Sequence, residues 1–237
     1  MIPIRDNIPT RRFPVWTVAI IAVNTAVWLF YELPDLNRAV LDAAFFPCEV
    51  DGACTAPGLG WPADALTSMF MHGGWIHILG NMLFLWIFGN NVEDAMGRIR
   101  FPLFYLAAGF AATALQAFVT LQFGTVADGR VPNVGASGAI AGVLGAYFLL
   151  YPRARVVTLT LFVLITAIEV PAMVFLGIWF LFQLWQGGFD LLAPTAGGGV
   201  AFFAHIGGFV FGLLAVYPFT AGRRPRSREP AWPRSEP

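Results

Sequence analysis

The sequence predicts an all-α integral membrane protein, a bundle of six transmembrane helices with both termini in the cytoplasm. Of its 237 residues, 57% are hydrophobic and only 12% are charged, whereas a soluble domain has roughly 45–50% apolar and about 25% charged residues. The apolar residues form stretches of about 20, the length of a membrane-spanning helix. They lack the alternation of outer-membrane β-strands. This composition argues against a soluble enzyme, a disordered chain and a nucleic-acid-binding module.

Charged residues and Gly or Pro delimit six apolar stretches, each about 20 residues long. They are 14–32, 69–90, 101–121, 134–151, 169–186 and 200–219. The first is too long for a secretory signal and is expected to stay as an uncleaved anchor.

The stretches divide the chain into three regions. We expect a cytoplasmic segment at 1–13, one membrane domain at 14–220 with an outer loop at about 33–68, and a disordered, Arg- and Pro-rich tail at 221–237. The apolar segment 156–168 is interpreted as a half-buried or interfacial lead-in to the fifth span, because two spans there would put the tail outside.

The orientation follows from the arginines, which supply all 14 basic residues. With six spans and the N-terminus inside, 12 arginines lie in the cytoplasm and only Arg38 and Arg130 lie outside. Because basic residues near helix ends stay in the cytoplasm, this split predicts a multi-pass protein of the cell (inner) membrane.

Polar residues within the spans indicate where function resides, since a polar group in hydrocarbon needs a partner or a role. His77, Ser137 and His205 lie early in the second, fourth and sixth spans, which all run from outside to inside. At 1.5 Å per residue they reach depths of roughly 5–12 Å. The sequence therefore places three unlinked polar groups at one level, on the extracytoplasmic side.

Each of these groups also has a structural interpretation. Gly135-Ala136-Ser137-Gly138 is typical of close helix packing, His205 of a packing hydrogen bond, and His77 with Asn81, which share a helix face, of an interhelical clamp. Taken together they supply a nucleophile, a general base and oxyanion donors.

With these residues the sequence resembles the rhomboid intramembrane serine proteases of the six-span bacterial type. The resemblance covers about 61–219. It rests on His72-x4-His77-x3-Asn81, on GASGAIAG around Ser137, on AHIGGFVFG around His205, and on the turn Val92-Glu93-Asp94-Ala95-Met96-Gly97-Arg98.

The resemblance implies a rhomboid-like helical bundle that cleaves transmembrane segments of other membrane proteins. Ser137 would be the nucleophile and His205 its base, a dyad without a carboxylate as third member. His77, Asn81 and the Ser137 amide would hold the oxyanion. His72, Gly135, Gly138 and Gly208 would support the site, with His72 also lining a water-filled cavity.

The expected partners are transmembrane protein substrates and the lipid bilayer, with no nucleic acid and no metal or organic cofactor. A metal site built from the three histidines is disfavoured by the Ser and Asn context. A non-catalytic rhomboid-like scaffold that binds transmembrane helices is the alternative function. The sequence carries no indication of an oligomeric state.

The chain departs from the family pattern in the outer loop. Where many rhomboids carry a Trp-Arg pair, it reads Trp61-Pro62-Ala63-Asp64. Cys48 and Cys54 are not recognised as a family feature, and for them a small disulfide ring on an oxidising exterior and free thiols both stay open.

Overall fold

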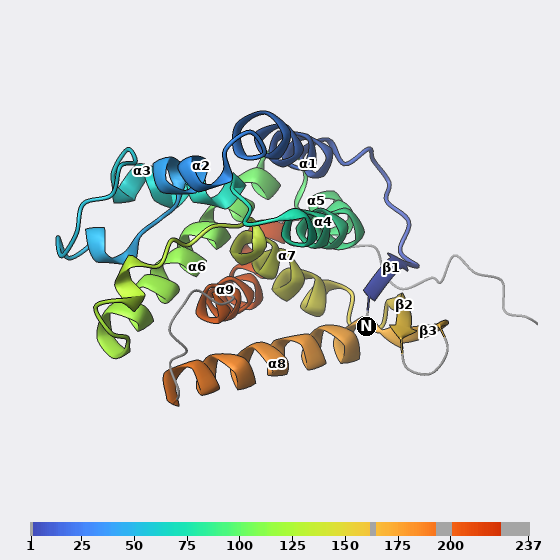
Figure 1. The fold of residues 1–237 in the computed structure, drawn as a ribbon. Helices are drawn as coiled ribbons and strands as arrows, with labels where there is room; N and C mark the ends of the chain where they lie inside the picture. Colours follow the sequence, from blue (N-terminus) through green and yellow to red (C-terminus); the bar gives the residue numbers. More distant parts are fainter. Residues whose placement is uncertain (1, 162–164, 193–200, 224–237) are drawn as a thin grey trace, which may run out of the picture.

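The structure is a computed structural model that describes residues 2–161, 165–192 and 201–223. It is mostly helical, with a small sheet at one end (Figure 1). The helices of the described part are α1 (Val15–Val27), α2 (Leu36–Ala43), α3 (Trp61–Thr67), α4 (Trp75–Phe84), α5 (Asn90–Met96), α6 (Arg100–Phe123), α7 (Ser137–Leu150), α8 (Ala172–Leu192) and α9 (Phe202–Thr220). Single turns are η1 (Trp28–Glu32), η2 (Pro47–Glu49), η3 (Ser68–Phe70), η4 (Leu85–Gly89) and η5 (Asp128–Arg130); the strands are β1 (Ile2–Asp6), β2 (Arg155–Leu161) and β3 (Ile165–Pro171).

The long helices are those of a membrane protein. Within the described residues, four are long and apolar enough to cross a bilayer: α1 extended by η1, α6, α8 and α9. Helix α7 is apolar but shorter, and the stretch predicted at 69–90 contains α4, which the π-helical turn η4 joins to α5. The prediction of a mostly helical membrane fold is confirmed. Of the predicted tail, residues 224–237 lie outside the described residues.

The outer surface of the bundle is apolar. Large side chains remain exposed, such as Phe30 (81%), Leu103 (58%) and Leu214 (74%). Single exposed apolar residues are ordinary on soluble proteins, but contiguous apolar surface requires a partner. On helices that are long enough to span a bilayer, that partner is the hydrocarbon of the lipid.

Helix α7 lies at the centre of the bundle (Figure 1) and packs most closely on α9. Glycines make this approach possible: a Cβ at Gly208 of α9 would overlap the carbonyl oxygen of Gly138, and one at Gly212 would overlap that of Gly142. Backbone therefore packs on backbone, as is usual where small residues line a membrane helix interface. This contact fixes the first turn of α7 relative to that of α9.

The sheet corrects the all-α prediction. Strands β2 and β3 form an antiparallel hairpin in register from Arg155↔Pro171 to Leu161↔Ile165, and β1 pairs with β2. Val156, Thr158 and Thr160 are buried while their neighbours are more exposed, the period-2 pattern of a half-buried strand. The prediction of an interfacial lead-in is therefore replaced by a hairpin, and α8 begins at Ala172.

Two carboxylates at the sheet end receive definite partners. Glu93, in the turn that resembles the family's, accepts hydrogen bonds from the backbone N–H of Trp16 (3.0 Å) and Thr17 (2.8 Å). It thus satisfies donors that the start of α1 leaves unpaired. Glu169 forms an ion pair with Arg155 at 3.8 Å; both side chains are exposed, so this pair contributes little stability.

Asp6 attaches the sheet to the helices. One of its carboxylate oxygens accepts hydrogen bonds from Tyr147 Oη at 2.5 Å and from Asn91 Nδ2 at 2.6 Å. Burial raises the pKa of Asp6 from 3.8 to about 6, because desolvation outweighs these hydrogen bonds.

We expect Gly212→Ala to lower the stability of the bundle. The added methyl group meets the backbone of α7, which has no rotamer with which to move away, and overpacking of this kind costs about 1–3 kcal/mol. The measurement is thermal unfolding in detergent. Gly188→Ala on α8 is the matched control, since a Cβ there would contact no described atom within 4 Å outside the local backbone of its own helix. Equal melting temperatures for the two variants would contradict the close α7–α9 contact.

We also expect Asp6→Asn to change how stability depends on pH. Because the folded pKa of about 6 lies above the ordinary value of 3.8, the native state binds more protons between these values, and wild-type stability falls as pH rises through this range. The variant lacks this decline. Its melting temperature relative to wild type should therefore increase from pH 4 to pH 7, and a constant difference would refute the assignment. Asp51→Asn, at an exposed position, is the control.

Candidate active site

Four of the predicted site residues come together around one cavity. Ser137 is the first residue of α7, His77 is the third of α4 and His205 is the fourth of α9. With Asn81 they line one cavity of about 1250 Å³, to which α6 and α8 also contribute. Helix α7 has 14 residues and so measures about 21 Å, less than the roughly 30 Å of bilayer hydrocarbon. Ser137, at the first residue of this short helix, lines the cavity.

Gly135 allows His77 and Ser137 to approach the same small space. It has φ +132, a conformation that side chains rarely adopt, and its N–H donates to the Ser68 carbonyl at 2.8 Å. A Cβ at this position would lie 2.8 Å from His77 Nε2 and 3.4 Å from Ser137 Oγ. A glycine is therefore required where these two side chains converge.

The site offers three N–H groups as hydrogen-bond donors. His77 Nδ1 accepts the Gly73 N–H at 3.3 Å, so in the neutral ring Nε2 carries the proton and donates. Asn81 is 8% exposed, and its Nδ2 has no hydrogen-bond partner among the described residues. The N–H of Ser137 starts a helix and has no intrahelical partner. Together they can stabilise a developing negative charge.

His205 is held by α8. Its Nδ1 lies 2.8 Å from Oε1 of Gln183, and the ring of Trp179 packs against it with centroids 5.7 Å apart and planes inclined at 39°. Sequence reasoning missed both residues because it sought a carboxylate at the depth of His205. The signal was present: a glutamine in an apolar stretch, four residues after a tryptophan, puts a polar group and an aromatic ring on one helix face.

His72 has a different position from the one predicted. Its side chain is fully buried and, within the described structure, does not line the cavity. Instead its ring meets the His77 ring edge to face, with centroids 5.1 Å apart, and its backbone N–H donates to Glu32 of η1. The prediction of a cavity-lining His72 is therefore wrong; the geometry is that of a residue behind His77.

Gly138 and Gly208 lie at the α7–α9 contact, and neither is among the described residues that line the cavity. A Cβ at Gly138 would come 2.6 Å from the Ala112 Cβ of α6. Their place in the structure is thus to allow close helix packing beneath Ser137 and His205.

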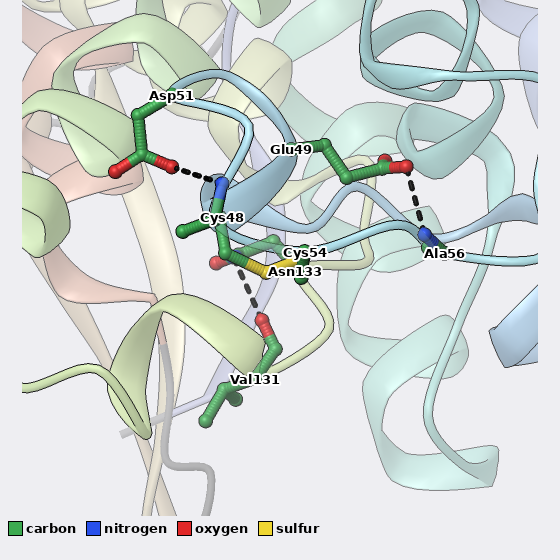
Figure 2. Close-up of a disulfide and its surroundings, with 8 residues drawn as sticks. Cys48, Glu49, Asp51, Cys54, Ala56, Val131 and Asn133 are labelled. Carbon is green, nitrogen blue, oxygen red and sulfur yellow. Dashed lines mark hydrogen bonds between the residues drawn. A yellow bond between two sulfur atoms is a disulfide. The ribbon is translucent and has the colours of Figure 1, made fainter.

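The outer loop contains a disulfide between Cys48 and Cys54, whose Cα atoms are 5.4 Å apart. Figure 2 shows it beside the chain at Val131 and Asn133. Phe45, three residues before Cys48, exchanges two backbone hydrogen bonds with Asn133, of 3.1 and 2.8 Å. The loop therefore braces the segment that leads into Ser137.

Asp64 explains the local structure of the outer loop where the chain lacks the Trp-Arg pair of many rhomboids. It is buried, and its carboxylate accepts the backbone N–H groups of Leu59 (3.1 Å) and Gly60 (3.0 Å). Pro62 occupies the first turn of α3, where its missing N–H is not needed. The sequence Trp61-Pro62-Ala63-Asp64 thus starts a helix.

The chain is similar to known proteins over most of its length. It is 30% identical over 204 residues to the human presenilin-associated rhomboid-like protein, mitochondrial, a match that covers 83% of this chain and 46% of the relative. It is 34% identical over 163 residues to RHOMBOID-like protein 4 of Arabidopsis thaliana, covering 65% of this chain and 33% of the relative.

A bacterial relative is YdcA of Bacillus subtilis, whose name marks it as a candidate rhomboid protease. The match is 31% identical over 140 residues and covers 59% of this chain and 64% of the relative. The chain thus spans about half or less of the two eukaryotic relatives and about two thirds of the bacterial one. Residues 61–222 match the Rhomboid domain. The resemblance predicted from the motifs is confirmed, and this membrane-embedded chain belongs to the rhomboid family.

Proposed function

We propose that the chain is an intramembrane serine endopeptidase that cleaves peptide bonds in or near transmembrane segments of other membrane proteins. The observation that carries this proposal is the convergence of Ser137, His205, His77 and Asn81 on one cavity. Membership of a family whose bacterial relative is named for proteolysis supports it. Side chains of α4, α7 and α8 also line the cavity. The outer surface of the bundle is apolar, which suits a protein whose substrates lie in the same membrane.

The proposal includes a topology of six membrane spans with both termini in the cytoplasm. The membrane is the cell (inner) membrane. The spans are α1 with η1, α4 to α5, α6, α7, α8 and α9. The 12-to-2 split of the arginines supports this orientation. It puts the cavity and the disulfide on the extracytoplasmic side, where disulfides persist.

The chemistry is acyl transfer to Ser137. His205 Nε2 accepts the proton of Ser137 Oγ as the oxygen attacks the substrate carbonyl, and the oxyanion is held by His77 Nε2–H, Asn81 Nδ2–H and the Ser137 N–H. When the C–N bond breaks, the leaving amine takes that proton from His205. Water then attacks the acyl ester, with His205 again as base, and releases the acid and free Ser137.

Water and substrate reach the site through the cavity. Its polar lining groups provide hydrogen bonds for water at a depth where lipid provides none. A substrate helix must unwind locally, because its carbonyls are otherwise bonded within the helix. Substrates with weak helices near the cleavage site are therefore favoured. The side chains, the Ser137 backbone N–H and water carry out every proposed step, and no cofactor enters the mechanism.

We expect the purified protein to cleave a tagged transmembrane reporter in liposomes. Ser137→Ala and His205→Ala should each lower the rate by at least about 10³-fold, since nucleophile and base act as a unit. Ser68→Ala is the control, because within the described residues its hydroxyl bonds only a neighbouring carbonyl, that of Ala65. Wild-type protein that binds the reporter as well as Ser137→Ala does, and cleaves nothing, would instead support the non-catalytic scaffold.

We expect Asn81→Ala to lower kcat by about 10²–10³-fold with KM nearly unchanged, because the lost donor acts on charge that develops only in the transition state. Asn81→Asp keeps the size but opposes the oxyanion with a carboxylate, so its kcat should be lower still. Steady-state kinetics on the reporter provide both values. An unchanged kcat in Asn81→Ala would remove this residue from the oxyanion hole.

A further inference from the structure

The described part of α8 contains a residue that the mechanism above leaves without a task. Gln183 is 5% exposed within an apolar helix, and its amide contacts His205. We infer that Gln183 is a positioning residue that holds the His205 imidazole in the tautomer able to accept the Ser137 proton. This inference rests on the proposed protease function.

The hydrogen bonds around Gln183 determine how its amide is oriented. Its Nε2 donates to the backbone carbonyl of Trp179 at 3.3 Å. A carbonyl can only accept, so the NH₂ group must face Trp179 and the amide oxygen must face His205. The assignment of the two amide atoms thus follows from the network itself.

The oriented amide in turn determines the tautomer of His205. Oε1 of Gln183 lies 2.8 Å from Nδ1 and has no proton to give, so Nδ1 must carry the hydrogen. The neutral imidazole then has its lone pair on Nε2. His205 lines the same cavity as Ser137, and Nε2 is the nitrogen left free to act as the base.

An amide suits this position better than a carboxylate would. In serine protease triads an aspartate holds the histidine and stabilises the imidazolium. An ionised side chain within a transmembrane helix is costly unless it is paired. The Gln183 amide offers an acceptor dipole without a net charge, so it fixes the tautomer and favours the imidazolium at a smaller desolvation penalty.

Trp179 reinforces this arrangement from the same helix. It lies one turn before Gln183, so the two side chains share a face, and its ring packs on the imidazole at 5.7 Å. The hydrogen bond limits rotation within the ring plane, and the indole limits tilting out of it. The position of the base is thus determined by α8 as well as by α9, to which it belongs.

The test replaces Gln183 with leucine, which has a similar size and no acceptor, and with glutamate, which restores an acceptor oxygen. Gln183→Leu should lower both kcat on the reporter and the rate of labelling by a small fluorophosphonate by about 10- to 100-fold, with KM within about twofold. Gln183→Glu should recover most of the labelling rate. The fluorophosphonate reports Ser137 activation without entry of a helix.

The matched control is Gln186→Leu, the same change three residues further along α8. It should leave kcat, labelling and melting temperature close to wild type. If Gln183→Leu is labelled and cleaves the reporter at the wild-type rate, Gln183 has no positioning role. The same conclusion holds if the loss of activity in Gln183→Leu parallels a lower melting temperature and Gln183→Glu does not recover the labelling rate.

Imidazole ¹⁵N NMR separates this inference from the proposed function. In wild type the His205 spectrum should show a protonated Nδ1 and a bare Nε2, and in Gln183→Leu a mixture of tautomers. A protonated Nε2 in wild type would overturn the inference even if the protein is a protease. Absence of labelling and cleavage in wild type, with the expected spectrum, would overturn the protease and leave the hydrogen bond established.

Discussion

The contact between the backbones of α7 and α9 is the interaction on which the rest of the structure depends. Ser137 and His205 lie in the first turns of these helices, so the spacing of the two side chains depends on the spacing of the helices. In lipid, helices gain little from the hydrophobic effect when they associate, and close packing must replace it. The contacts of Gly208 and Gly212 with α7 carbonyls supply that packing close to Ser137 and His205.

Satisfaction of polar groups explains how the site is arranged around this contact. His205 Nδ1 and His77 Nδ1 each have a partner. Asn81 Nδ2, in contrast, has none among the described residues, and it lines the cavity. A donor left without a partner in a low-dielectric site interacts strongly with a charge that forms beside it.

Much of this arrangement could be predicted from sequence because it is local. Apolar length and charged boundaries gave the long helices, and counting residues from the span ends brought His77, Ser137 and His205 to one level. The sheet was not predictable by the same means, since the apolar run after Arg155 resembles a membrane segment by hydropathy, and β2 pairs with β1, about 150 residues earlier.

Gln183 and the disulfide were missed or left open for related reasons. Whether Gln183 faces His205 depends on the rotation and tilt of α8, which periodicity in an evenly apolar helix does not determine. Whether Cys48 reaches Cys54 depends on a Cα separation, here 5.4 Å, that loop sequence alone does not give. In both examples the missing information is the relative placement of elements, and the residue types were already visible.

The way in which α8 is attached has a mechanical consequence. Its start is fastened to the turn that follows α7, where the backbone N–H of Ala172 donates to the Ala154 carbonyl (2.7 Å) and that of Met173 donates to the Pro152 carbonyl (3.1 Å). Gln183 lies 11 residues beyond Ala172, about 16 Å along the axis. With α8 as a lever that pivots at Ala172, a swing of about 10° moves Gln183 by about 3 Å, enough to break a hydrogen bond. The hydrogen bond between Gln183 and His205 therefore depends on the tilt of α8.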